Sequence, residues 1–184
     1  MDTSRFRIDS FACALGGLAL LTLAFVVERN GAAVIMCGLC FAGLLAARWV
    51  GFSRRALMPL AVGLVVILLM VWSAQPLSAW QTSTLAHLAG GALVGWVLAE
   101  SLRTHLAWPA WALVVLAGVC TLTVVWELGE YLGDRTFETP LIPSRGDSAV
   151  DIFFGSLGGA IGIGVAWLLL RLRGRATRGP APGT

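Results

Sequence analysis

The sequence predicts an all-α, polytopic membrane bundle of about six transmembrane helices with both termini cytoplasmic. The first observation is composition: of 184 residues, 58% are hydrophobic and 12% are charged, whereas a typical soluble domain has about 25% charged residues. The second is a series of long uncharged apolar runs, each near the roughly 20 residues that cross a bilayer core. The third is a strong bias in where the arginines fall between those runs.

Six apolar runs are expected to span the membrane, at residues 10–27, 31–47, 56–73, 84–99, 107–131 and 149–170. All six should be helical, because backbone groups in lipid must find their hydrogen-bond partners within the protein. The first run follows Arg5 and Arg7 as a signal peptide would, but it ends without a small-residue cleavage site, so we interpret it as a span. We expect one bundle over 1–173 and a disordered basic tail over 174–184.

The arginines predict the orientation. The chain has thirteen arginines and no lysine. An even number of spans places three of them on the outer side, Arg29, Arg135 and Arg145, and ten on the inner side. Cytoplasmic loops carry the excess of positive charge in membrane proteins. The scatter of arginines at segment ends favours this topological role over nucleic-acid binding, and it predicts a multi-pass membrane protein that contacts membrane lipids.

The four cysteines, Cys13, Cys37, Cys40 and Cys120, all fall inside apolar runs. Cys37 and Cys40 are three residues apart, so they share a helix face, and a metal or redox pair is one alternative. Small, polarizable packing residues are the favoured interpretation, and we expect no disulfide.

Four carboxylates and one histidine are the candidate functional residues. Glu127 and Glu130 close the fifth run, Asp147 and Asp151 open the sixth, and His87 lies just inside the fourth. On a helix, Glu127 and Glu130 lie about 60° apart, and Asp147 and Asp151 stack on one face. About 30 Å of helix separates each pair from the opposite membrane face. Three separate segments should therefore bring these groups to the same outer level of the membrane.

Such closely spaced carboxylates need compensation, and the sequence leaves several forms of it open. They could bind a divalent cation, with oxygen ligands suiting Mg²⁺, Mn²⁺ or Ca²⁺ and the histidine admitting Zn²⁺. They could pair with Arg135 or Arg145, or some could be protonated and serve as acid or base groups. A purely structural alternative has Glu127 and Glu130 facing water, Asp147 capping the sixth span and His87 bonding a neighbouring helix.

Glycines on the facing spans predict close packing around these groups. Gly91 and Gly95 are four apart, and the sixth span repeats the pattern with Gly155, Gly158, Gly159 and Gly162. Small residues at this spacing let membrane helices approach closely. We therefore expect the fourth and sixth spans to be in contact, which would bring His87 within reach of the carboxylates.

The strings Trp126-Glu127-Leu128-Gly129-Glu130-Tyr131 and Asp147-Ser148-Ala149-Val150-Asp151, followed by Gly155 and Gly158, resemble the YjdF-like family of bacterial inner-membrane proteins. That family carries a His, then Trp-Glu-x-x-Glu-aromatic, then Asp-Ser/Thr-x-x-Asp and a glycine-rich helix. The region is more distantly similar to VanZ-like proteins, in which Arg145 would match an arginine. The resemblance covers about residues 84–164. It implies a bacterial envelope protein, and the VanZ-like similarity implies a link to glycopeptide-antibiotic tolerance.

Three functions are compatible with these residues. The first is a divalent-metal-dependent enzyme acting at the outer leaflet on a lipid-linked or headgroup substrate. For that enzyme, the catalytic candidates are His87, Glu127 and Glu130. The candidate metal ligands are His87 and the four acids, and the candidate substrate-binding residues are Arg135 and Arg145. The second is a non-catalytic envelope protein that binds a lipid, a cell-wall precursor or a partner protein. The third is a small ion-coupled transporter, which is disfavoured because transport sites usually lie near the midplane.

Overall fold

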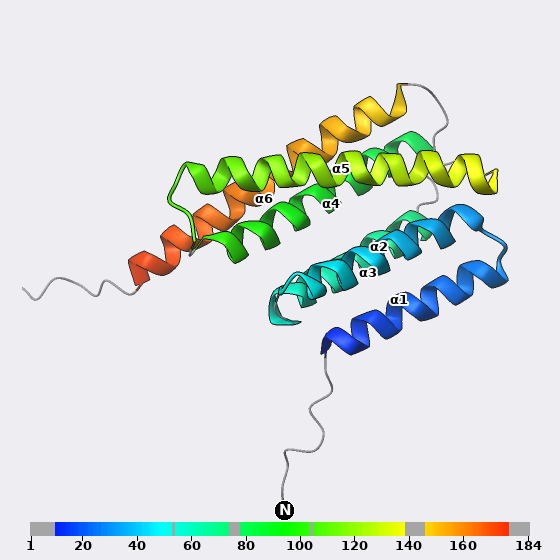
Figure 1. The fold of residues 1–184 in the computed structure, drawn as a ribbon, viewed down its shortest axis with the longest axis horizontal. Coiled ribbons are helices and arrows are strands. Elements are labelled where there is room, and N and C mark those ends of the chain that lie inside the picture. Colours follow the sequence, from blue (N-terminus) through cyan, green and yellow to red (C-terminus); the bar gives the residue numbers. More distant parts are fainter. Residues whose placement is uncertain (1–9, 53, 74–77, 104, 139–145, 177–184) are drawn as a thin grey trace, which may run out of the picture.

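The computed structural model describes residues 10–52, 54–73, 78–103, 105–138 and 146–176. Within these residues the chain is entirely helical apart from turns. The six helices are α1 (Ser10–Val27), α2 (Gly31–Trp49), α3 (Arg54–Ser73), α4 (Ala79–Leu102), α5 (Ala110–Phe137) and α6 (Asp147–Ala176). Consecutive helices run in opposite directions, so the start of α4, the end of α5 and the start of α6 lie at one end of the bundle (Figure 1).

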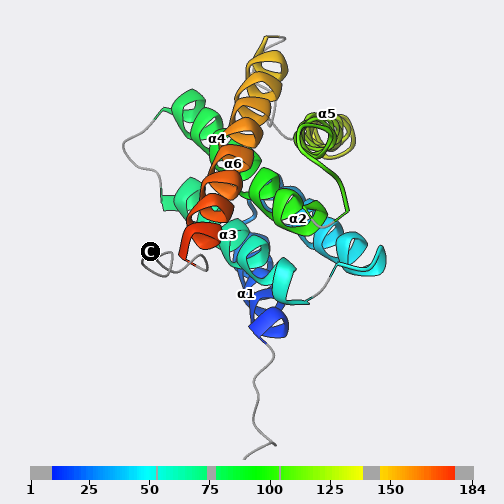
Figure 2. The same ribbon diagram turned by 90° about the vertical axis from the view of Figure 1, so that its left-hand side faces the viewer.

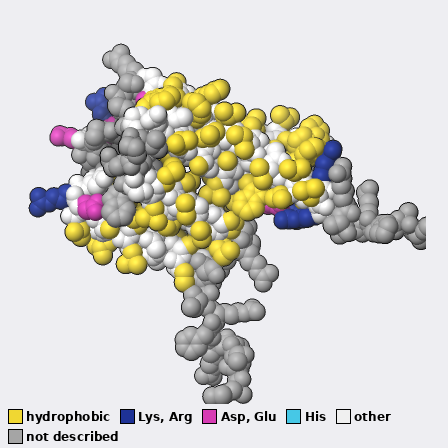
Figure 3. Space-filling model, turned by 180° about the vertical axis from the view of Figure 1, so that it is seen from behind, with side chains coloured by type: hydrophobic (Ala, Val, Ile, Leu, Met, Phe, Trp, Pro, Cys, Tyr) yellow, Lys and Arg dark blue, Asp and Glu magenta, His cyan; other side chains and the backbone are white. Residues whose placement is uncertain are grey.

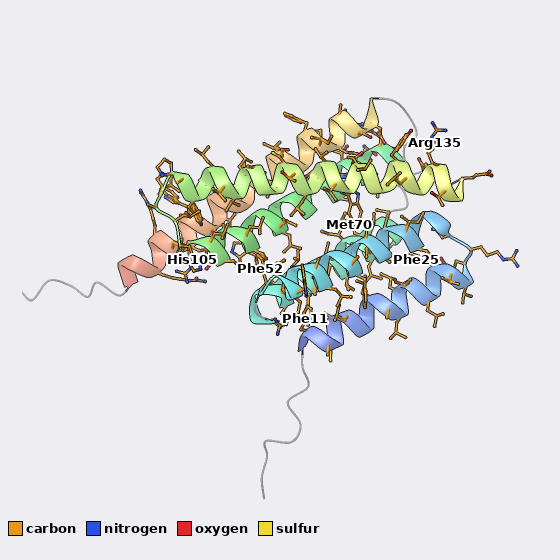
Figure 4. All side chains as sticks on the ribbon, in the orientation of Figure 1. Phe11, Phe25, Phe52, Met70, His105 and Arg135 are labelled. Carbon is orange, nitrogen blue, oxygen red and sulfur yellow. The ribbon has the colours of Figure 1, made fainter. Side chains whose placement is uncertain are left out.

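The helices form two three-helix groups, each with its own core. In Figures 1 and 2, α1, α2 and α3 lie on one side of the molecule, and α4, α5 and α6 lie on the other. Phe25, Leu44 and Leu57 are buried in the first core, and the labels of Phe11 and Phe25 in Figure 4 mark it between α1 and its neighbours. Trp111 and Val115 are buried in the second. The groups meet where α3 contacts α4 and where α2 contacts α5.

Three helices meet the length and composition expected of a membrane span, Trp80–Leu102, Ala110–Thr136 and Asp147–Arg173. The described parts of the other three are shorter apolar helices, Phe11–Val27, Ala33–Trp49 and Leu57–Met70. The structure thus confirms an all-helical protein with membrane-spanning character, and it supports three spans by length instead of six. Large apolar side chains also cover the outside of α5: Leu113, Val125 and Leu128 are each more than half exposed. A bilayer accounts for such a surface, which soluble proteins avoid.

The helix boundaries depart from the predicted ones by five or six residues at the start of α4 and at the ends of α5 and α6. We predicted that the fourth span begins at residue 84, but α4 begins five residues earlier, at Ala79. The Ser78 hydroxyl accepts a hydrogen bond from the Gln81 amide, and the Gln81 side chain accepts one from the Ser78 amide. This capping box stabilises the first turn of a polar helical extension. At the other end, α6 continues to Ala176, three residues into the segment predicted to be disordered. The remainder of that segment lies outside the described residues.

The predicted close packing of α4 against α6 is confirmed, and it is the most extensive helix contact in the described chain. A Cβ atom on Gly95 would lie 2.6 Å from the carbonyl oxygen of Gly159, and one on Gly158 would lie 2.8 Å from the Ala92 amide nitrogen. One on Gly91 would meet the Gly155 carbonyl. Backbone therefore lies directly on backbone along this interface, which glycine permits and any larger residue prevents.

Cys37 and Cys40 are buried in the core of α1, α2 and α3, which is the packing environment predicted for them.

Candidate functional site

One imidazole and two carboxylates from three helices meet at the end of the bundle where α4 begins. His87 lies on α4, Glu127 on α5 and Asp151 on α6. The His87 Nε2 atom is 3.1 Å from Glu127 Oε1, and its Nδ1 atom is 3.3 Å from Asp151 Oδ1. Glu127 is 5% exposed and Asp151 is 2% exposed. The predicted convergence of distant segments on one level is therefore confirmed for these three residues.

Ser83 holds two members of this cluster, and the sequence analysis missed it. Its hydroxyl donates a 2.9 Å hydrogen bond to Asp151 Oδ2, and its carbonyl oxygen lies 3.0 Å from His87 Nδ1. Ser83 precedes His87 by four residues, the spacing of neighbours on a helix face. That spacing would have identified it had α4 been predicted to begin at residue 79.

The surroundings of His87 determine which ring nitrogen carries the proton. Both oxygens nearest to Nδ1, the Ser83 carbonyl and the Asp151 carboxylate, are acceptors. Nδ1 must therefore be the protonated nitrogen of the neutral ring. Nε2 is then an acceptor, and Glu127 Oε1 lies 3.1 Å from it. Two acceptors at this distance repel each other unless the ring carries a second proton, the Glu127 carboxyl is protonated, or a cation binds both atoms.

The buried carboxylate of Glu127 also lacks hydrogen-bond partners in the part of the chain that the structure describes. Neither of its carboxylate oxygens has a hydrogen-bond partner among the described residues, and neither does His87 Nε2. The 3.1 Å approach of Nε2 to Oε1 meets the distance of an ion pair, but its geometry is not that of a hydrogen bond. Buried polar atoms are nearly always satisfied in native proteins, because each one left without a partner costs about 1–3 kcal/mol. These three atoms are therefore buried polar groups whose hydrogen-bonding capacity is unused in the described residues.

Glu130 and Asp147 are buried nearby but stand outside the three-residue cluster. Glu130 Oε1 accepts a 2.7 Å hydrogen bond from the indole nitrogen of Trp126, one turn earlier on the same helix. Asp147 is the first residue of α6 and is 8% exposed. The donor atoms within 4.8 Å of one another belong to His87, Glu127 and Asp151. Glu130 and Asp147 were predicted as ligands as well, and in the structure they lie outside this group of donor atoms.

Arg135, one of the two arginines predicted to bind substrate, does not join the cluster. Arg135 is exposed, its Nε donates to the Tyr131 hydroxyl at 3.3 Å, and its guanidinium carbon lies 5.7 Å above the Tyr131 ring. No ion pair in the described part of the chain joins Arg135 to a carboxylate of the cluster. Arg145 lies outside the described residues. Charge compensation by Arg135 is therefore not how these acids are accommodated.

The first helical group supports the acidic turn of α5 from behind. A Cβ atom on Gly129 would lie 2.9 Å from Leu39 Cδ1 of α2, and Trp126 packs against the core of α1, α2 and α3. With Trp126 and Gly129 held against α2, Glu127 is turned away from α2 and toward His87 of α4. The N-terminal helices therefore set the rotation of α5 as well as packing against it.

No protein-family model, curated protein or solved structure matches this chain.

The arrangement matches what a divalent cation requires. Two ligands at about 2.1 Å from an ion, at angles of about 90–110°, lie roughly 3.0–3.4 Å apart. The separation of His87 Nε2 and Glu127 Oε1 is 3.1 Å. The Ser83 carbonyl orients the imidazole through Nδ1, as an acceptor does in most histidine–metal sites, so Asp151 is still counted among the three donors. The described donors number three, so an ion held there would keep coordination positions for water or substrate.

Proposed function

We propose that this chain is a multi-pass membrane protein that holds a divalent cation between His87, Glu127 and Asp151, and that this centre serves an enzyme acting on a lipid-linked or headgroup substrate. The observation that carries the proposal is the pairing of His87 Nε2 with Glu127 Oε1. Both atoms are buried acceptors without a hydrogen-bond partner in the described chain, and they are separated by the distance that two ligands of one ion adopt.

The donor set favours particular ions. One imidazole nitrogen and two carboxylates suit Zn²⁺ and Mn²⁺ better than Ca²⁺ or Mg²⁺, which prefer oxygen ligands alone. When bound, such an ion supplies a Lewis acid and lowers the pKa of a bound water. The chain supplies the rest: Ser83 orients His87 and Asp151, and Glu127 offers two oxygens, one for the ion and one to accept a proton from a water or substrate hydroxyl.

The membrane setting supports a lipid-linked substrate. The cluster joins the three helices that are long enough to span a bilayer, and it lies near the ends of two of them, four residues into α6 and ten residues before the end of α5. A headgroup at the membrane surface could reach this depth. We extend the proposal to a six-span topology with cytoplasmic termini in a bacterial inner membrane, with the site near the outer face. Arginine distribution and the resemblance to YjdF-like and VanZ-like proteins support this extension.

A second candidate is a non-catalytic envelope protein in which the cluster locks three helices together or binds a lipid, a cell-wall precursor or a partner protein. One observation favours it. A doubly protonated His87 would form an ion pair with each carboxylate, at 3.1 Å and 3.3 Å, without any ligand. A buried ion-pair network of this kind fixes the register of its helices.

The two candidates are separated by metal analysis of the full-length protein purified in detergent. After EDTA treatment, Zn²⁺ and Mn²⁺ binding would be measured by calorimetry for the wild type, for Glu127→Gln and for Glu138→Gln. The last is the matched control, because it makes the same substitution at an exposed residue beyond the end of α5. We expect one ion per chain for the wild type and the control, and an affinity lower by at least about 100-fold for Glu127→Gln.

Turnover is then tested on a total polar lipid extract incubated with the metal-loaded protein and examined by mass spectrometry. A lipid species that is consumed by the wild type and not by Glu127→Gln supports the enzyme. Metal binding without any lipid change would favour the binding protein. Wild type that takes up neither ion would contradict the metal centre and leave the ion-pair network as the explanation of the cluster.

A further inference from the structure

The end of the bundle remote from His87 carries the opposite charge. There α4 ends, α5 begins and α6 ends, and the described side chains include Arg103, Arg171 and Arg173 with one acid, Glu100. Sixteen residues of α4 separate His87 from Arg103, which corresponds to about 24 Å of helix. This end is therefore a separate surface, and what is inferred about it does not rest on the proposed cation site.

A single carboxylate, that of Glu100, forms ion pairs with two of these arginines. The Arg103 Nε atom lies 3.0 Å from Glu100 Oε2, and an Arg173 guanidinium nitrogen lies 3.3 Å from Glu100 Oε1. Both guanidinium groups remain substantially exposed, with 40% and 62% of the side-chain surface accessible. The bridge joins α4 to α6 through one carboxylate.

The third arginine lies on an aromatic platform. The Arg171 guanidinium is 3.8 Å from the ring centroid of Trp167, an attraction that leaves its charge in place. The Trp108 ring contacts both Trp111 and Trp167, with centroids 5.2 and 6.3 Å away. Trp111 is fixed by a 2.8 Å hydrogen bond from its indole nitrogen to the Ala99 carbonyl. The start of α5 and the last part of α6 are thus joined by indoles packed at tilted angles, and Trp108 is 57% exposed.

Arginine and tryptophan side chains at this end border the apolar outer surface of the bundle. In Figure 3 the arginines near the end of α6 adjoin hydrophobic side chains, and in Figure 4 His105 marks this end while Arg135 marks the other. Leu168 and Leu172, on the last turns of α6, are each about half exposed. We call Arg103, Trp108, Trp167, Arg171 and Arg173 the basic rim.

We propose that the basic rim binds the headgroups of anionic phospholipids in the leaflet that this end of the bundle faces. Three arginines contribute positive charge to the rim, and in the described residues the Glu100 carboxylate contacts two of them. Guanidinium groups bind phosphate oxygens through paired N–H donors, and indoles prefer the headgroup level of a bilayer. A soluble anion would satisfy the arginines alone. A phospholipid satisfies the arginines with its phosphate and the adjoining leucines with its acyl chains.

The test measures lipid selectivity of the full-length protein. Protein in detergent would be equilibrated with equal amounts of phosphatidylglycerol and phosphatidylcholine, and the lipids retained would be counted by native mass spectrometry. The variant Arg103→Gln with Arg171→Gln removes two rim charges. Its matched control, Arg29→Gln with Arg135→Gln, removes two exposed charges at the other end. Melting temperatures show whether each variant remains folded.

We expect the wild type and the control to retain phosphatidylglycerol preferentially. The rim variant should lose roughly five-fold of that preference per arginine, about 25-fold in total. A pair of Arg→Lys substitutions at positions 103 and 171 should preserve most of it, and about 1 M salt should abolish it in the wild type. The lysine variant and the salt dependence test lipid binding by the basic rim even if the glutamine variant unfolds.

Three results would overturn the proposal. The wild type could retain both lipids equally, the rim variant and the control could lose the same preference, or inorganic phosphate at millimolar concentration could displace phosphatidylglycerol. The last would identify the rim as a site for soluble phosphate. None of these results bears on cation binding at the His87 cluster, so failure of the two proposals can be told apart.

Discussion

The contact between Gly95 of α4 and Gly159 of α6 gives the sharpest test of how the site is assembled. In Gly95→Ala, the new Cβ would lie 2.6 Å from the Gly159 carbonyl oxygen and 2.9 Å from its Cα, whereas ordinary contact begins near 3.4 Å. Both neighbours are backbone atoms, so no side chain can turn aside. The helices must move apart by about 0.8 Å, the difference between 3.4 Å and 2.6 Å.

Separating α4 from α6 would also change the site, because His87 lies on α4 and contacts Asp151 on α6. If α6 moves as a rigid rod, the 3.3 Å approach of Nδ1 to Asp151 Oδ1 becomes about 4.1 Å, which is beyond hydrogen-bond reach. Overpacking of this kind costs about 1–3 kcal/mol of stability. We therefore expect Gly95→Ala to lower both the stability of the protein and its affinity for a divalent cation.

Gly90→Ala is the matched control. Gly90 lies on the same helix, and a Cβ atom there would meet nothing within 4 Å. Replacing glycine by alanine in an open helical position is neutral or favourable by up to about 1 kcal/mol. Unfolding would be followed by heating the purified protein in detergent and by titration with a denaturing detergent. Equal or greater stability of Gly95→Ala relative to Gly90→Ala would refute the backbone contact on which this reasoning depends.

Three further outcomes are expected. Ser83→Ala, which removes the hydroxyl bound to Asp151, should weaken Zn²⁺ or Mn²⁺ binding about 10–100-fold in calorimetry; unchanged affinity would show that Ser83 does not position the site. EDTA should lower the melting temperature of the wild type, because an ion at about 100 times its Kd contributes about 2.7 kcal/mol; a melting temperature insensitive to EDTA and added metal would count against a bound ion. Trp111→Phe should cost about 0.5–1.5 kcal/mol by removing the indole hydrogen bond to the Ala99 carbonyl, which keeps its bond from the Arg103 amide. Metal affinity should not change, since Ala99 lies at the opposite end of α4 from His87.

Much of the fold was predictable because its physical causes are local in the sequence. Each of the six predicted apolar runs corresponds to one of the described helices, since burial in lipid or in a helical core selects long uncharged stretches. The larger errors came where polar residues extend an apolar helix. Ser78 and Gln81 cap α4 ahead of its hydrophobic part, and hydropathy is insensitive to such a cap.

The candidate site was predictable in part. Spacing along α5 and α6 and the glycines of α4 and α6 were enough to expect His87, Glu127 and Asp151 at one level. Spacing could not separate Glu127 from Glu130, because the two lie only about 60° apart on a helix. The difference came from α2: contacts of Leu39 with Gly129 and of the first core with Trp126 rotate α5 so that Glu127 faces His87 and Glu130 bonds to Trp126.

From the sequence alone came an all-helical protein of membrane character, the ends of the helices at which acids gather, and the glycine stripe that lets two helices touch. These follow from composition and helical periodicity, which act over a few residues. Tertiary structure decided which carboxylates meet the imidazole, which ring nitrogen faces Glu127, and that Ser83 holds Asp151. Such choices depend on the rotation and depth of whole helices, which are set by packing between residues that are far apart in the chain.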